Sequence, residues 1–211
     1  MELTMVGDVN FLAILLAALA ASLSPGPASL AIAGTSMARG RRAGLLLTAG
    51  IMVGSLVWSI AAPLGLGAIM LAHSWVFEII RYAGATYLLY LAWKSARSAF
   101  SKHAIEPKTI GGGATALIAR GAALHITNPK SILFFGALYS IGMPSDASAA
   151  QLATVVAAVG VQATVIYSGY AVLFSAPSTA RLYLRLRRWF EGAFAVGFAF
   201  AGLKIITARL Q

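Results

Sequence analysis

The sequence predicts an all-α membrane protein with six transmembrane helices, on three observations. The 211 residues are 59% hydrophobic and 10% charged, which is more apolar than a soluble domain. Uncharged runs cover 9–38, 43–72 and 147–180, each longer than the ~20 residues that a helix needs to cross a bilayer. Basic residues gather in three of the connections between apolar runs. We place the spans at 9–34, 43–70, 76–93, 121–141, 149–174 and 189–208.

The distribution of basic residues predicts the orientation of these spans. Most of the 16 Lys and Arg lie in three connections: after the first span, between the third and fourth, and between the fifth and sixth. Connections rich in Lys and Arg stay in the cytoplasm, so we expect the N-terminus to be extracytoplasmic. The net charge of +10 is thereby explained by membrane topology, and no nucleic-acid partner is needed to account for it.

A polar cytoplasmic linker at 98–113 divides the chain into two three-helix halves, 1–97 and 114–211. Because each half has an odd number of spans, the second half starts on the opposite side of the membrane, and any repeat between the halves is inverted. Pro25 in the first span and Pro129 in the fourth suggest such a repeat, of three plus three helices with helices 1 and 4 broken. Inverted repeats with broken helices occur in many secondary transporters, with the substrate site near the midplane.

The segment "SPGP" should break the first span. Pro25 and Pro27 donate no backbone hydrogen bond, and Gly26 relaxes the chain between them. Irregular backbone at membrane depth is tolerated only where protein or a water-filled cavity surrounds it, and a new helix that begins at Pro27 would direct N–H groups toward an anion. The alternative is a simple proline kink. We predict a substrate pathway formed here by Ser24, Pro25, Gly26, Pro27, Ala28 and Ser29.

The segment "TNPKS" makes the parallel case in the fourth span. Pro129 interrupts the helix, Asn128 can cap a new one, and Lys130 lies about 15 Å beyond Arg120 along a helix. An ionisable side chain at that depth is a functional hypothesis, the alternative being that Lys130 extends to the interface. We add these three residues to the predicted substrate pathway. His125 is a candidate proton relay, the alternative being an ordinary hydrogen-bonded histidine.

Four glycines form two GxxxG pairs, Gly40 with Gly44 and Gly50 with Gly54. Small residues at this spacing let a neighbouring helix approach closely, so we assign them to helix packing.

Enzymatic and metal-dependent functions find no support in the sequence. There is no cysteine, which removes thiolate ligands and dithiol chemistry. The six acidic residues include no close pair, and the three histidines do not have the spacing of metal ligands. We expect no cofactor, no metal site and no catalytic residues.

Four segments carry a resemblance to a known family: "SPGPASL", "ARGRRAGLLLTAGIMVG", "YAGATYLLYLAWKSAR" and "GAALHITNPKSILFF". In this order and spacing they resemble the signatures of the LysE/RhtB family of bacterial amino-acid exporters. The resemblance implies a six-helix carrier of the bacterial inner membrane, driven by the proton gradient as an antiporter. Ala28 departs from the asparagine that relatives often have, and 139–141 depart from a frequent Pro-Gln-Phe element.

The resulting hypothesis is a secondary exporter of amino acids or related small zwitterionic metabolites. Its expected partners are the amino-acid substrate, protons as coupling ion and the lipid bilayer, with a homo-oligomer left open. The alternative is a metal-cation exporter of similar fold, against which stands the shortage of acidic, thiol or clustered histidine ligands. A third hypothesis, a membrane scaffold without transport, predicts that Pro25 and Pro129 tolerate alanine.

Overall fold

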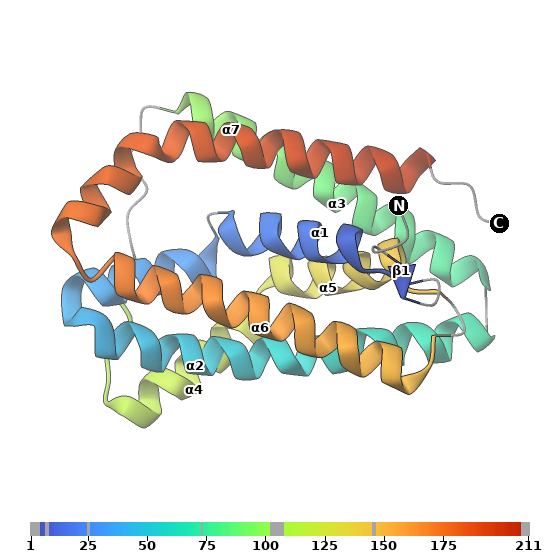
Figure 1. Cartoon of the computed structure of the whole chain (residues 1–211), viewed down its shortest axis with the longest axis horizontal. Helices are drawn as coiled ribbons and strands as arrows, with labels where there is room; N and C mark the ends of the chain where they lie inside the picture. The colour runs from blue at the N-terminus through green and yellow to red at the C-terminus, as the bar shows by residue number, and fades with distance from the viewer. Residues whose placement is uncertain are drawn as a thin grey trace.

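The computed structural model describes residues 5–6, 9–24, 26–72, 74–101, 108–144 and 147–207. These residues form a helical bundle with one short hairpin (Figure 1). The hairpin is β1 (Met5–Val6) paired antiparallel with β2 (Val9–Asn10). The helices are α1 (Phe11–Leu23), α2 (Pro27–Ala72), α3 (Ser74–Phe100), α4 (Ala114–Ile126), α5 (Pro129–Gly142), α6 (Ala149–Leu173) and α7 (Pro177–Thr207).

Helix α2 consists of two helices joined at Gly40. Gly40 has φ 80° and ψ 172°, a backbone conformation that a side chain disfavours and glycine tolerates. The segments 27–39 and 41–72 therefore run in opposite directions, and the bend lies at the end of the bundle where α7 begins (Figure 1). Arg39, Arg41 and Arg42 are exposed at this turn.

The predicted helices are present, with differences at their ends. The first predicted span corresponds to α1 and 27–39, and the fourth to α4 and α5. Helix α4 begins at 114, earlier than the predicted 121, and α7 begins at Pro177, before the predicted 189. Helix α3 continues to Phe100, three residues into the predicted linker. The all-α prediction is confirmed, whereas the number of membrane crossings stays a prediction.

By length and apolar character, two helical stretches within the described parts of the chain could cross a membrane, Pro27–Gly65 and Ala149–Leu173. Phe11–Leu23, Ala114–Ile126 and Lys130–Tyr139 are shorter apolar helices. The two short helices α1 and α4 each have 13 residues and each precede a helix that begins with proline. Each half of the chain thus contains a short helix that is interrupted before a helix beginning with proline.

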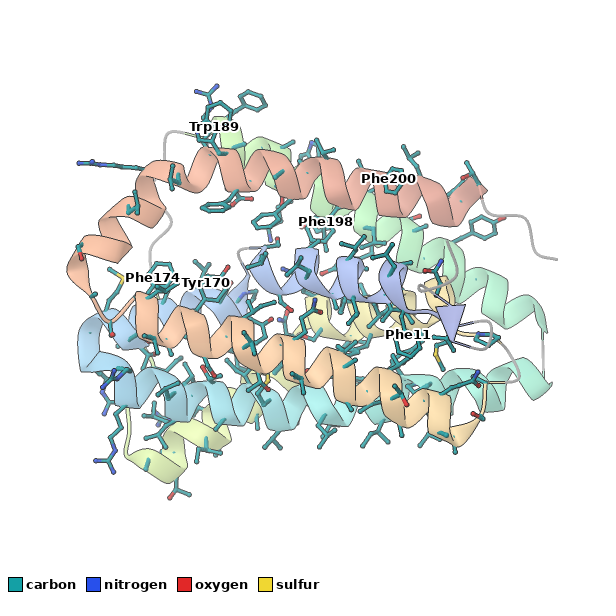
Figure 2. The ribbon with its side chains drawn as sticks, in the orientation of Figure 1. Phe11, Tyr170, Phe174, Trp189, Phe198 and Phe200 are labelled. Atoms are coloured by element: carbon teal, nitrogen blue, oxygen red, sulfur yellow. The ribbon has the colours of Figure 1, made fainter. Side chains whose placement is uncertain are left out.

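The exterior of the bundle is apolar and its interior contains polar side chains. Val165, Val196 and Phe200 are 67%, 72% and 69% exposed, and Phe200 lies on α7 (Figure 2). Thr35 and Ser36 are fully buried. Exposed large apolar side chains outside with buried polar side chains inside are typical of a protein whose solvent is lipid.

The most extensive helix contacts join the two halves of the chain. Helix α3 packs along α7, and α2 packs along α4 and α6, while α1 and α5 lie between these two groups (Figure 1). The halves are therefore interleaved rather than packed as separate three-helix units.

The described end of the linker lies across the end of 27–39. The Arg39 guanidinium donates hydrogen bonds to the carbonyls of Ile110 (3.1 Å) and Gly112 (2.8 Å). The Ile110 N–H donates to the Thr35 hydroxyl at 3.0 Å. Gly34 permits this contact, because a Cβ there would meet the backbone of Lys108 at 2.8 Å. The segment 108–113 thus fastens the first half of the chain to the start of α4.

Candidate functional site

The first span is broken between Leu23 and Pro27. Ser24 has extended backbone, with φ −67° and ψ 131°. Helix α2 starts with Pro27, and proline suits this position because the N–H that it lacks would have no partner within the helix. The Gly26 carbonyl accepts from the Leu30 N–H at 2.9 Å, and the Gly26 N–H donates to the Ser29 hydroxyl at 2.9 Å. Gly26 and Ser29 therefore cap the start of α2. The predicted Pro25 lies outside the described residues.

The carbonyl groups at the end of α1 are bonded by side chains from the second half. The Lys130 ammonium donates to the carbonyls of Ala21 and Ser24, each at 3.1 Å. The Tyr170 hydroxyl donates to the Leu23 carbonyl at 2.7 Å, and Tyr170 lies beside this break on α6 (Figure 2). A cation at a helix C-terminus complements the negative end of the helix dipole. Lys130 thus extends toward the first break and not outward to a membrane interface.

The second break, between Ile126 and Pro129, is capped in a similar way. The Asn128 side chain accepts from the Lys130 N–H at 3.0 Å, and its carbonyl accepts from the Ser131 N–H at 2.9 Å. From the first half, the Trp58 indole donates to the Ile126 carbonyl at 3.1 Å. Each break therefore has a carbonyl bonded by the opposite half of the chain.

A pocket lies between the two breaks and encloses about 510 Å³ of empty space, including its opening to solvent. The structure brings together there the predicted residues Ser24, Gly26, Ala28, Ser29, His125, Asn128 and Lys130. Pro27 is exposed and is not among the lining residues. Further polar lining comes from Ser22, Ser55, Ser131 and Tyr167, and apolar lining from Ala18, Ala21, Phe134, Phe135, Val159 and Ala163.

The electrostatic character of this pocket is positive. Lys130 is its one charged lining residue among the residues that the structure describes, and no lining residue is acidic. Ala28 and Ser29 occupy the first turn of α2, where backbone N–H groups have no partner within the helix. A mostly apolar wall with a few converging polar groups is typical of small-molecule sites, and these particular groups suit an anionic group.

The sequence did not point to Ser55, Ser131 or Tyr167, because serine and tyrosine are common on apolar helices and carry no positional signal alone. Ser55 and Tyr167 come from α2 and α6, and only the tertiary packing brings them to the breaks.

The predicted packing glycines differ in their surroundings. A Cβ at Gly50 or Gly54 would clash with the backbone of α4, and one at Gly44 with the Ser36 side chain. A Cβ at Gly40 would meet nothing within 4 Å, so this glycine makes no packing contact. Its left-handed φ instead forms the turn between 27–39 and 41–72.

Trp58→Phe tests the bond across the second break. The variant leaves the Ile126 carbonyl without this donor, and we expect it to lower the free energy of unfolding by about 1 kcal/mol and the Tm by about 2–4 °C. Thermal unfolding in detergent measures the change. Trp189→Phe is the matched control, because Trp189 is 78% exposed on the outer face of α7 (Figure 2). Equal effects in both variants would contradict a specific role for the indole.

An all-α protein with an apolar exterior and a pocket with converging polar groups between two interrupted helices has the features of a membrane carrier. The family model described as LysE type translocator matches residues 19–209, and the chain therefore belongs to this family.

Known relatives are similar over nearly the full length of the chain. A protein named threonine efflux protein from Escherichia coli K12 is 27% identical over 202 residues, which cover 94% of this chain and 98% of the relative. A leucine efflux protein of Klebsiella pneumoniae is 27% identical, with 97% of each chain covered. A homoserine/homoserine lactone efflux protein of Salmonella typhimurium is 29% identical, with 89% of this chain and 91% of the relative covered. No solved structure matches the chain significantly.

Proposed function

We propose that this protein exports amino acids or related small zwitterionic metabolites across the bacterial inner membrane, as a proton-coupled secondary antiporter. The observation that carries the proposal is the position of Lys130 in a pocket between two broken helices. The names of the relatives, which refer to efflux of threonine, leucine and homoserine, support the substrate class.

The substrate carboxylate would bind at Lys130. An ammonium group has three protons, and two of them are directed at the Ala21 and Ser24 carbonyls. The third remains for a ligand in the pocket, where the first N–H groups of α2 at Ala28 and Ser29 add further donors. The apolar wall that includes Phe134, Phe135 and Val159 would hold an aliphatic side chain.

The pocket does not suit the alternative substrate, a metal cation. Its charged group is an ammonium and its other side-chain donors are hydroxyl, amide and imidazole groups. Within the described parts of the chain there is no group of three His, Asp or Glu that would hold a metal ion. Like charges repel, and divalent cations need anionic or clustered ligands.

Transport requires that the pocket open to each side in turn. We propose six crossings, with the N-terminus outside, and two moving groups: α3 with α7, and α2 with α4 and α6. This division follows the extensive contacts and places helices of both halves, 1–97 and 114–211, in each group. The bond of Tyr170 to the end of α1 would change when the groups move, because it joins α6 of one moving group to α1, which lies between the groups.

Flux from loaded proteoliposomes tests the proposed function. Vesicles containing the purified protein and labelled L-threonine, L-leucine or L-homoserine should lose label faster than protein-free vesicles, and an imposed pH gradient should accelerate the loss. Vesicles loaded with manganese or zinc test the alternative in the same preparation. If no amino acid in a broad panel is moved, the proposed substrate class is wrong.

A further inference from the structure

His125 is buried in the pocket wall without a hydrogen-bond partner. It lies in the last turn of α4, is 5% exposed, and lines the pocket. Its Cβ packs against α2 at Gly54, where an added Cβ would approach it to 2.9 Å. Neither ring nitrogen has a partner among the residues that the structure describes.

Such an arrangement is uncommon, because the large majority of buried side-chain polar atoms are hydrogen-bonded. An unpartnered buried group destabilises the folded state, so a histidine in the pocket wall whose two buried nitrogens have no partner is suited to bind a solute in the pocket.

The described lining of the pocket offers a charged partner to only one end of a zwitterionic solute. Its carboxylate has Lys130, but its ammonium group finds no carboxylate among the described lining residues. Four main-chain acceptors at the two breaks already have side-chain donors: Ala21 and Ser24 accept from Lys130, Leu23 from Tyr170, and Ile126 from Trp58. A neutral imidazole carries one nitrogen that accepts a hydrogen bond, and His125 lines the pocket with this nitrogen unpartnered.

We propose that a ring nitrogen of His125 accepts a hydrogen bond from the substrate α-ammonium group, and that this contact makes the carrier select amino acids over acids that lack the ammonium. The inference rests on the proposed function. It gives the two charged ends of the substrate separate partners: Lys130 for the carboxylate and His125 for the ammonium.

Competition with analogues that each lack one charged group tests this assignment. The probes are L-leucine, its des-amino acid (hydrogen in place of the α-ammonium) and its decarboxylated amine, and the corresponding three compounds built on L-threonine. Each competes with the labelled parent amino acid for transport in proteoliposomes. The readout is the ratio of inhibition constants between an analogue and its parent, which cancels differences in protein amount or overall rate.

In His125→Leu the preference for the amino acid over its des-amino acid should fall about tenfold, the usual effect of losing a hydrogen bond to a charged group. Affinity for the des-amino acid itself should stay unchanged, because that compound has no donor at the α-carbon. His125→Asn and His125→Gln keep an accepting oxygen and should recover part of the preference. Lys130→Met is the complementary variant, since it should instead reduce the preference for the amino acid over the amine.

Three results would overturn the inference or separate it from the proposed function. An unchanged preference in His125→Leu and in both amide variants means that the imidazole does not contact the ammonium. An unchanged preference together with a lost response to the pH gradient would replace the inference with the proton-relay role. A wild-type protein that moves neither amino acid would refute the proposed function itself, before any His125 variant is compared.

Discussion

Lys130→Met is expected to lower amino-acid export by roughly 30-fold or more, since removing one member of a buried charged contact costs about 2–5 kcal/mol. Methionine has a similar length and can occupy the space beside Gly26, where the lysine stem now lies within van der Waals distance of an added Cβ. It supplies no proton to a carboxylate. Efflux of labelled L-leucine or L-threonine from proteoliposomes, normalised to incorporated protein, measures the loss.

The same variant should still fold and insert. The substitution leaves the Ala21 and Ser24 carbonyls without the ammonium, but it also removes a charge from a low-dielectric site, and water in a polar pocket can bond to the carbonyls. Lys108→Met is the matched control, because it removes one positive charge from an exposed position. Unchanged flux in Lys130→Met, with normal flux in the control, would remove Lys130 from the substrate site.

Both breaks and the residues beside them could be predicted from the sequence. Proline has no N–H and glycine has no side chain, so the helix breaks at "SPGP" and "TNPKS" can be predicted from these residues alone, without knowledge of any neighbouring helix. Both segments line one pocket. The inverted arrangement of two three-span halves stays a prediction, and it would bring the two breaks together near the middle of the membrane.

The partners of the breaks could not be predicted. Tyr170 and Trp58 bond to the ends of α1 and α4 from positions more than 60 residues away, and an aromatic residue on an apolar helix gives no sign of which carbonyl it will reach. The role of Gly40 was missed for a related reason. Its spacing from Gly44 fits a packing motif, whereas its backbone forms a turn with φ 80°, and spacing does not report φ.

The interleaving of the halves is the larger difference between sequence and structure. A three-plus-three sequence division suggests two units that rock against each other, but the extensive contacts run from α2 to α4 and α6 and from α3 to α7. Apolar helices in lipid give no preference for a sequence neighbour, because lipid satisfies their surface equally well. Close packing of small residues decides the partners instead.

The contact between α2 and α4 shows how such packing is achieved. Gly50 and Gly121 face each other: a Cβ on Gly121 would lie 3.2 Å from the Gly50 Cα and 3.1 Å from the Ile51 nitrogen. A Cβ on Gly50 would approach the Ile118 Cα to 2.9 Å. Every one of these atoms belongs to the main chain, so no rotation of a side chain can relieve the overlap. The two helices must separate to admit even one methyl group.

Gly121→Ala is therefore expected to lower the free energy of unfolding by about 2 kcal/mol and the Tm by about 4–8 °C. Gly197→Ala is the matched control, because Gly197 lies within α7 and an added Cβ there would meet nothing within 4 Å. In that variant alanine should be neutral or stabilising, as it usually is in a helix. If alanine destabilises the protein at 121 and not at 197, the loss of stability comes from the contact between α2 and α4. A similar loss of stability in both variants would contradict this explanation.

The same substitution should also affect transport. Since Gly54 on the same face of α2 packs against the His125 Cβ, separating the two helices should displace the imidazole and weaken export beyond the loss of folded protein.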